Sequence, residues 1–419
     1  MNYQFRIKPT TEQQELMLGW METCRRLYNR CLRDLKDWLN SRKCSLDSCS
    51  INREYIMSPD IPFPSYLEQK RQLTQWKKNN PWLKEVHSQV TQDCVKRLHN
   101  TWERFKSKKF GFPRFKKFGR YQSFLFPQFK ENPIKGNKIK LPKIGEIEIN
   151  CHRIIPDGFK VKGVRIVSRV RGTVWYAIVT IQCDVKIPDP LPFGRGIGID
   201  IGLESYLVTS DNFRVEPARF FRDLQSRLKV LQRKASRKKK RSKNWEKAQL
   251  RVAKLHHQIA NARKNFHFQT SHLLCDQADM IFVEDINFKM TAKGFLGKAA
   301  RTRRSSSSTT GNATHCALDG GFGQFRDLLS WVCWKRGKFF AQVDHKFTSQ
   351  ICPKCNAHTG KKELNERVHH CPECNYQTSR DHASSEVILN RGVELIVPTD
   401  CRERKLSAES VLPGVAISR

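Results

Sequence analysis

The sequence predicts an α+β protein with several domains: an antiparallel β-barrel interrupted by a bundle of helices, followed by an α/β domain with a small cysteine-rich insertion. Three observations predict this class. The 419 residues are enough for two or three domains that each bury a core. Strand patterns and helix patterns follow one another in blocks, and a proline-rich linker at residues 187–192 separates two of the blocks. Two CxxC pairs lie near the C-terminus.

The helical bundle is expected over residues 10–107. Apolar residues recur every three or four positions over residues 16–38, which predicts a long amphipathic helix. Gln14 follows Thr11 by three residues and predicts a capping box at the start of that helix. Another helix with its own apolar stripe is expected over residues 80–105. We expect these aromatic-rich stripes to form the bundle core; the alternative is that they stack on bases.

Short runs of alternating or β-branched residues predict the strands of the barrel. These runs are residues 3–7, 123–126, 138–141, 146–150, 161–170 and 173–183. Arg171-Gly172 predicts the turn of a hairpin between the last two runs. We therefore assign residues 1–9 and 108–187 to the β-barrel and treat the helices as an insertion in it.

The charge of the chain predicts a polyanionic partner. Lysine and arginine number 77 against 40 acidic residues, for a formal net charge of +37. Such an excess repels itself unless a polyanion neutralises it, and aromatic residues interleaved with basic ones suit nucleic acid. A structural protein of the ribosomal type and a membrane-surface protein are the alternatives. The chain has no signal peptide and no apolar stretch of about 20 residues, so we expect a soluble cytoplasmic protein of a prokaryote, associated with the nucleoid.

One segment concentrates this charge. Nine of the fifteen residues from Lys229 to Lys243 are Lys or Arg, and none is acidic. Within a predicted basic helix, these side chains are the candidates for contact with a nucleic-acid backbone. The candidates are Arg233, Lys234, Arg237, Lys238, Lys239, Lys240 and Arg241. A localisation signal is the alternative in a eukaryotic host.

Three carboxylates stand at the boundaries of predicted elements in the second block. Asp200 lies in the middle of an apolar run, which together with a strand at residues 206–210 matches the opening hairpin of an RNase H-like fold. Glu284 ends the short apolar strand 280–284, and Asp381 lies at the start of a helix. Taken singly, the three could be a turn residue, a surface acid and a helix cap. Their combination favours a shared site.

Such a site suits phosphodiester hydrolysis, which needs an activated water and a stabilised leaving oxygen. Two Mg²⁺ ions about 4 Å apart supply both, and hard cations prefer oxygen ligands. We expect Asp200 to bridge the ions, with Glu284 and Asp381 each completing one side. Asp285 is excluded, because its side chain points to the opposite face if the strand continues.

The two CxxC pairs predict one structural Zn²⁺ ion. Fifteen residues separate the pairs, which is the spacing of a zinc ribbon with four thiolate ligands. The ligands are Cys352, Cys355, Cys371 and Cys374. A redox CxxC needs only one pair, and the remaining eleven cysteines have no pairing pattern, so a disulfide framework is not expected. His369 and His370 are near but redundant as ligands.

The order of these motifs resembles the TnpB family, which insertion sequences encode and which is similar to compact type V CRISPR effectors. The segments that carry the resemblance are Gly196–Asp200, Phe282–Asn287, the cysteine ribbon, Arg380-Asp381, Gly111–Phe115 with Ser123-Phe124, Leu318–Phe325 and Val343–Gln350. The resemblance covers residues 1 to about 395. One departure is that Ala383-Ser384-Ser385 follow Asp381, where the family often has Asn and Ala residues.

The resemblance implies an RNA-guided DNA endonuclease that cleaves next to a short flanking motif, with a guide RNA from the transposon end and double-stranded target DNA as partners. It implies a wedge-like barrel, a helical recognition domain, and a RuvC-like nuclease domain into which the zinc ribbon is inserted. The implied boundaries are 1–9 and 108–187 for the barrel and 10–107 for the recognition domain. The nuclease domain takes residues 193–347 and 379–400, and the zinc ribbon takes residues 348–378. The tail at 401–419 is expected to be disordered.

Other functions remain open. An RNA-guided DNA-binding regulator would have lost a carboxylate, a compact CRISPR effector would differ in its genomic locus, and a resolvase or transposase would carry out strand transfer. The sequence leaves monomer and dimer undecided.

Overall fold

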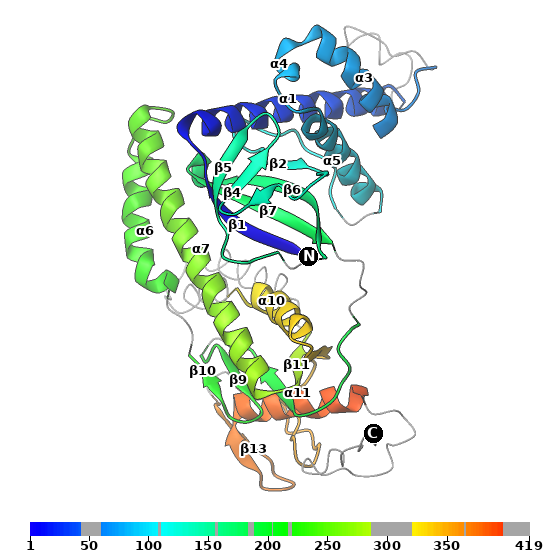
Figure 1. Ribbon diagram of the computed structural model, residues 1–419. Coiled ribbons are helices and arrows are strands. Elements are labelled where there is room, and N and C mark those ends of the chain that lie inside the picture. The colour runs from blue at the N-terminus through cyan, green and yellow to red at the C-terminus, as the bar shows by residue number, and fades with distance from the viewer. Residues whose placement is uncertain are drawn as a thin grey trace. The chain divides into compact units, whose positions relative to one another are not determined.

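The computed structural model divides the chain into two compact units, residues 1–186 and 187–419 (Figure 1). It describes residues 1–42, 60–107, 110–155, 158–182, 188–202, 204–216, 220–285, 321–363 and 366–396. Within these residues, no helix combines the length and the apolar composition needed to cross a membrane. The tail 401–419 and parts of two motif segments, residues 286–287 and 318–320, lie outside the described residues.

The first unit is built on a seven-stranded antiparallel sheet. Its strands are β1 (Asn2–Lys8), β2 (Ser123–Phe126), β3 (Ile134–Lys135), β4 (Lys138–Leu141), β5 (Gly145–Asn150), β6 (Lys160–Arg169) and β7 (Val174–Gln182), in the order β2-β6-β7-β1-β5-β4-β3. The N-terminal strand lies in the centre, and its residues pair with both β5 and β7. Each predicted strand is confirmed, and β3 is additional. In the described residues no ladder joins β2 to β3, so closure into a barrel stays a prediction.

The described residues of the first unit form the helices α1 (Thr11–Ser41), α3 (Tyr66–Asn79), α4 (Pro81–Lys84) and α5 (Ser88–Lys106). Their apolar faces and the sheet share one core, in which the Trp20 and Phe124 ring centroids are 5.7 Å apart. The expected bundle core is therefore confirmed.

Two details of these helices were predicted wrongly. The capping box joins Thr10 and Gln13, one residue earlier than expected, because Thr11 is already helical. The helix expected over 80–105 is two helices, since His87 has extended backbone angles (ψ 138°) that interrupt the helical hydrogen bonds.

The second unit contains a five-stranded sheet with the order β10-β9-β8-β11-β12. Its strands are β8 (Gly196–Asp200), β9 (Leu207–Thr209), β10 (Arg214–Val215), β11 (Met280–Glu284) and β12 (Phe339–Val343). Strand β9 is antiparallel to both of its neighbours, β8 and β10, whereas β8, β11 and β12 are parallel to one another. The predicted β8–β9 hairpin is confirmed. Asp200, however, is the last residue of β8 and does not lie mid-strand, because the strand pairing ends there.

Helices cover both faces of this sheet. On one face, α7 (Lys243–Gln277) and α10 (Phe322–Lys335) pack against Ile199 and Val283. On the other face, α11 (Arg380–Ile396) packs against Phe282 through Ile388. Residues of odd number on β8 and β11 thus face α7 and α10, and residues of even number face α11. This alternation decides where the acidic side chains point.

The helix α6 (Phe220–Ser236) forms a hairpin with α7 that has its own apolar seam, including Leu228 and Leu255. The basic run at 229–243 is not one helix, as predicted, but the end of α6, a turn and the start of α7. The turn forms because the Ser242 side chain caps α7, accepting from Trp245 N at 3.2 Å. The run therefore lies at the tip of the hairpin.

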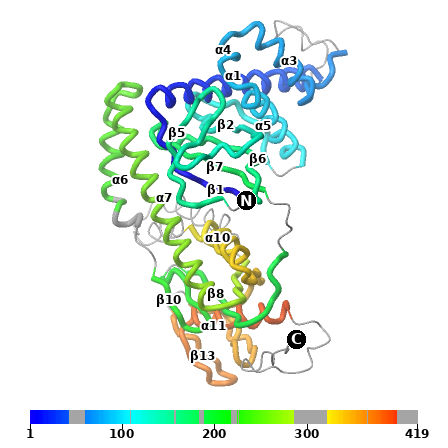
Figure 2. The backbone as a smooth tube through the Cα atoms, viewed as in Figure 1, coloured from blue at the N-terminus to red at the C-terminus, as the bar shows by residue number. Residues whose placement is uncertain are grey.

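A small cysteine-containing module lies between β12 and α11 in the chain. Its strands β13 (Val368–His370) and β14 (Gln377–Ser379) form a two-stranded antiparallel ladder. Both strands contact α11, and Figure 2 shows this orange segment beside the red helix.

Candidate functional site

The ends of two neighbouring parallel strands bring Asp200 and Glu284 together. The register pairs Ile199 of β8 with Val283 of β11, so the two acids follow at the next position. Neighbouring strands lie about 4.8 Å apart, and residues in the same register point to the same face. Both side chains therefore lie on the face that α11 covers.

Helix α11 brings Asp381 to the same place. A Cβ on Gly198 would lie 2.1 Å from the Ser385 carbonyl oxygen and 2.5 Å from Leu389 N, so the helix backbone rests directly on β8. The Leu389 side chain also reaches Gly196, which means that α11 runs antiparallel to β8. One helical turn before Ser385 is Asp381, and two strand residues after Gly198 is Asp200; these two steps are similar in length, about 6 Å. Asp381 therefore lies over Asp200.

Burial and mutual repulsion define the electrostatics of the three acids. Loss of solvation raises the pKa of Asp200 well above its ordinary value, and the charges of Glu284 and Asp381 raise it further, against the opposing charge of Arg380. Burial also raises the pKa of Glu284, which is 7% exposed. Like charges packed in this way destabilise the fold unless a cation neutralises them. The donor set of carboxylate oxygens fits a hard divalent cation.

Sequence reasoning missed one residue of this site. The Thr348 hydroxyl donates to Glu284 Oε1 at 2.5 Å. Thr348 lies in the segment Val343–Gln350, which carries part of the family resemblance. No local pattern in the sequence connects this segment to Glu284. Asp285 is 67% exposed and pairs with Arg326 of α10 at 3.2 Å, so its predicted opposite orientation is confirmed.

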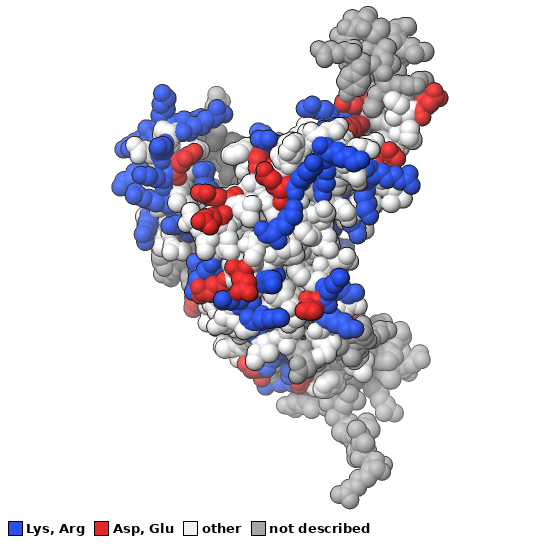
Figure 3. Space-filling view, turned by 45° about the horizontal axis from the view of Figure 1, so that its top comes forward, with Lys and Arg blue, Asp and Glu red and all other residues white. Residues whose placement is uncertain are grey.

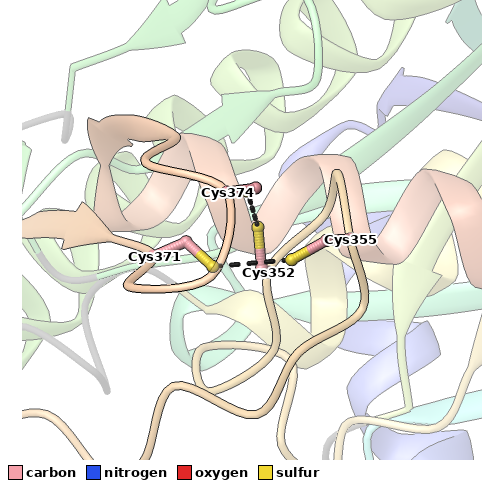
Figure 4. Close-up of side chains that lie close together, drawn as sticks. All are labelled: Cys352, Cys355, Cys371 and Cys374. Carbon is pink, nitrogen blue, oxygen red and sulfur yellow. Dashed lines mark hydrogen bonds between the residues drawn. The ribbon is translucent and has the colours of Figure 1, made fainter.

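The four predicted cysteines form one compact cluster. Their Sγ atoms all lie within 4.8 Å of one another, with 3.6 Å between Cys352 and Cys374 and 3.5 Å between Cys355 and Cys371. Figure 4 shows the side chains pointing toward one another. A tetrahedron of Zn–S bonds of about 2.3 Å places sulfurs roughly 3.8 Å apart, so the cluster could hold Zn²⁺. Among the described residues, no other group of three or more His, Cys, Asp or Glu side chains brings its ligand atoms together closely enough to hold a metal ion.

The two cysteine pairs have the same local geometry. In each pair, the backbone N–H of an asparagine donates to the carbonyl oxygen of the first cysteine. Asn356 N donates to the Cys352 carbonyl at 3.0 Å, and Asn375 N donates to the Cys371 carbonyl at 2.9 Å. Both asparagines have the positive φ that such a tight turn requires. His369 is buried beside Lys362 and is not part of the thiol cluster, in agreement with the prediction.

Side chains of α11 hold the cysteine module. Asn390 Nδ2 donates to the Pro353 carbonyl at 2.9 Å, within the first CxxC pair. The Tyr376 hydroxyl, two residues after the second pair, donates to Glu386 Oε2 at 2.7 Å. The helix that carries Asp381 is thus tied to both pairs of cysteines.

The tip of the α6–α7 hairpin is the most basic described segment. All seven predicted contact residues are exposed, and Figure 3 shows Lys and Arg crowded at the upper left, where Figure 1 has the hairpin. Three of them, Lys234, Arg237 and Lys238, line a hollow of about 500 Å³. Lys247 and Arg251 of α7 line it too and were missed, because they lie outside the continuous basic run.

Comparisons with known proteins agree with the order of the motifs. Residues 180–293 match the model OrfB_IS605, described as "Probable transposase", residues 322–388 match a "Cas12f1-like, TNB domain", and residues 1–44 match a helix-turn-helix domain of the OrfB_IS605 group. In the described part of that last range, the chain forms strand β1 and the single helix α1.

Similar whole proteins are also found. The chain is 29% identical over 395 residues to the "Putative RNA-guided DNA endonuclease InsQ" of Escherichia coli (strain K12), covering 93% of this chain and 92% of that protein. It is 27% identical to the "Putative RNA-guided DNA endonuclease" of Streptomyces pristinaespiralis over 313 residues, 73% of each chain. A solved Cas12f1–sgRNA–target DNA complex contains a similar fold, with a TM-score of 0.53 at 12% identity, covering 91% of this chain and 83% of that one. Motif order, domain matches and the relatives therefore agree with the resemblance of this chain to the TnpB family of insertion-sequence proteins.

Proposed function

We propose that this protein is an RNA-guided DNA endonuclease that hydrolyses phosphodiester bonds with two Mg²⁺ ions held by Asp200, Glu284 and Asp381. The single observation that carries the proposal is the convergence of these acids from the ends of β8 and β11 and the first turn of α11. The names of the relatives, which describe RNA-guided DNA endonucleases, support the guided and DNA-directed parts of the activity.

The arrangement of the ligands suggests their roles. When bound, Mg²⁺ supplies an activated water and neutralises charge on the scissile phosphate. Asp200 has Glu284 beside it on the sheet and Asp381 above it on the helix, so its carboxylate would be the central ligand of the site. Glu284 and Asp381 would each hold one side. A bound cation would favour the ionised carboxylate of Asp200 and would therefore lower its raised pKa.

We assign residues 193–347 and 379–400 to a RuvC-like nuclease domain and 348–378 to a zinc-ribbon insertion in it. The first unit would supply the wedge-like domain and, over residues 10–107, the recognition domain. These would hold a guide RNA derived from the transposon end and its heteroduplex with double-stranded target DNA, next to a short flanking motif. The cytoplasmic location stays a prediction.

The basic hairpin tip is proposed as a nucleic-acid backbone contact. Its charges converge on one hollow without an acidic lining residue. Replacing Lys234, Arg237 and Lys238 with Gln should lower the slope of log affinity against log salt by about 0.7–0.9 for each lost phosphate contact.

A matched control removes the same charge elsewhere. Arg195, Lys346 and Arg367 lie in the second unit, are exposed, and each pairs with an acidic residue. Their triple Gln variant should leave the salt slope for the co-purified RNA unchanged. Equal slopes for the two variants would remove the hairpin from the interface.

The function is tested by purifying the full-length protein from its host locus and sequencing the RNA that it retains. The complex is then offered a target library with a randomised flank and Mg²⁺. We expect cleavage next to one motif, and its loss in Asp200→Ala with RNA binding retained. Failure to retain a specific RNA would refute guidance, while cleavage by the Asp200→Ala complex would refute the metal site. Binding of the target without cleavage by the unaltered complex would favour the regulator.

A further inference from the structure

Thr348 is a buried hydroxyl at the border between the cysteine module and the acidic site. It is 6% exposed, and its Oγ1 lies 2.5 Å from Glu284 Oε1 and 3.3 Å from the His345 carbonyl oxygen. A hydroxyl has one proton to donate. The shorter distance and the stronger acceptor both favour donation to the carboxylate of Glu284. No other hydrogen bond to this carboxylate is found among the described residues.

The backbone around Thr348 belongs to the first turn of the cysteine module. Gln350 N donates to the Phe347 carbonyl at 2.9 Å, and Thr359 N returns from beyond the first CxxC pair to the Gln350 carbonyl at 2.7 Å. Phe347 has a φ of 61°, in the left-handed region, so the turn depends on these neighbours to keep its shape. The three residues that these hydrogen bonds join, Phe347, Gln350 and Thr359, all lie within nine residues of Cys352 and of Cys355.

We propose that Thr348 is a positioning residue for the metal ligand Glu284. Its hydroxyl holds Oε1, which limits rotation of the carboxylate and leaves Oε2 directed to the cation. The cysteine module thereby has a role beyond its own fold: it holds the hydroxyl that orients one ligand, as α11 holds another. This inference rests on the proposed metal site.

The test measures metal binding without any nuclease reaction. Full-length, zinc-loaded protein is titrated with Mn²⁺, and the free ion is followed by electron paramagnetic resonance. Thr348→Val keeps the shape of the side chain and removes the hydroxyl, and it should weaken Mn²⁺ binding about 10- to 100-fold, the usual effect of losing a group that orients a ligand. Thr348→Ser keeps the hydroxyl and should restore binding to within about threefold of the unaltered protein.

The matched control is Thr359→Val. Thr359 belongs to the same module and donates to the Gln350 carbonyl at 3.1 Å, but touches no carboxylate. It should leave Mn²⁺ affinity unchanged. Equal losses in Thr359→Val and Thr348→Val would mean general loosening of the module and would overturn the inference, as would unaltered affinity in Thr348→Val. All variants are compared at equal zinc content.

A further variant separates this inference from the proposed function. Asp200→Ala should abolish Mn²⁺ binding. If Asp200→Ala binds Mn²⁺ as the unaltered protein does, or the unaltered protein binds none, the metal site itself is wrong. If Asp200→Ala loses binding and Thr348→Val keeps it, only the role of Thr348 is wrong.

Discussion

At the scale of single residues, the contact between α11 and β8 depends on the absence of a side chain at Gly198. A Cβ there would lie 2.1 Å from the Ser385 carbonyl oxygen, a backbone atom that can move only with the helix. Glycine permits this approach, and the approach in turn carries Asp381 to Asp200.

We predict that Gly198→Ala lowers the free energy of unfolding by about 1–3 kcal/mol, the usual cost of overpacking a core. It should also reduce cleavage strongly, because α11 must shift. Thermal unfolding and cleavage rates measure the two effects. The control is Gly19→Ala, at an exposed helical position where a Cβ would meet nothing within 4 Å. It should stabilise the protein by up to about 1 kcal/mol. A neutral Gly198→Ala would contradict the close packing.

The acids of the site predict a stability that depends on pH in the absence of added divalent metal. The folded-state pKa of Asp200 is raised, so the folded protein binds this proton more tightly than the unfolded chain. As the pH rises above the unfolded value of about 4, ionisation therefore destabilises the fold, up to the folded pKa. Asp200→Asn should be the more stable protein at pH 7–8, by at least about 1 kcal/mol, the energy of one pKa unit.

Denaturant unfolding at several pH values measures this difference, which should be smallest near pH 4 and widen as the pH rises. Asp276→Asn serves as the control, since Asp276 is 64% exposed and paired with Arg336. Its effect should stay within about 0.5 kcal/mol. If Asp200→Asn is less stable at every pH, the carboxylates do not repel one another.

At the scale of elements, α11 joins the cysteine module to the sheet. One face of the helix rests on β8 through Gly198, while Asn390 and Glu386 bond to the segments around the two CxxC pairs. The position of Asp381 therefore depends on both contacts.

We predict that Cys355→Ser removes zinc from the protein, because three thiolates and a hydroxyl bind the ion far less well than four thiolates. The melting temperature should fall by roughly 5 °C or more, since the module loses its bound metal. Metal analysis and a thermal melt give the two values. Cys151→Ser alters a half-buried thiol of the first unit and should keep one zinc ion per chain. Zinc retained in Cys355→Ser would contradict the cluster.

At the scale of the whole molecule, the chain consists of two units with separate cores. The large core of the first unit runs from Phe5 to Ile181, and the three cores of the second unit begin at Ile197. A strand from the N-terminus pairs with β7 near residue 180, so the first unit is complete only when both segments are present.

We predict that a fragment of residues 1–186 folds by itself and unfolds cooperatively. A fragment of residues 1–150 lacks β6 and β7, and β1 then loses one of its two partners. The shorter fragment should not unfold cooperatively. Circular dichroism with thermal and urea denaturation distinguishes the two. A longer fragment that melts without a transition would show that its core needs the second unit.

Local patterns in the sequence were enough to predict most strands, the grouping of the four cysteines and the place of the three acids at the boundaries of elements. An apolar run that ends in an acid marks a strand end, and a CxxC pair forms its turn from adjacent residues, so neither depends on distant packing. The sequence places the start of α1 one residue too late and predicts one helix for the basic run, whereas the structure has two. In both, capping by Thr10 and Ser242 decided the boundary, and competing caps nearby look alike in sequence.

The sequence by itself determined that this chain is an α+β protein that resembles the TnpB family, with Asp200, Glu284 and Asp381 in a fixed order around a cysteine module. Only the tertiary structure decided that they lie close enough to interact electrostatically. Glu284 comes beside Asp200 through strand pairing across 84 residues, and Asp381 comes over it through contact at Gly198. The Thr348–Glu284 hydrogen bond is of the same kind. Contacts of this kind depend on how separate elements pack, which no local pattern of residue types encodes.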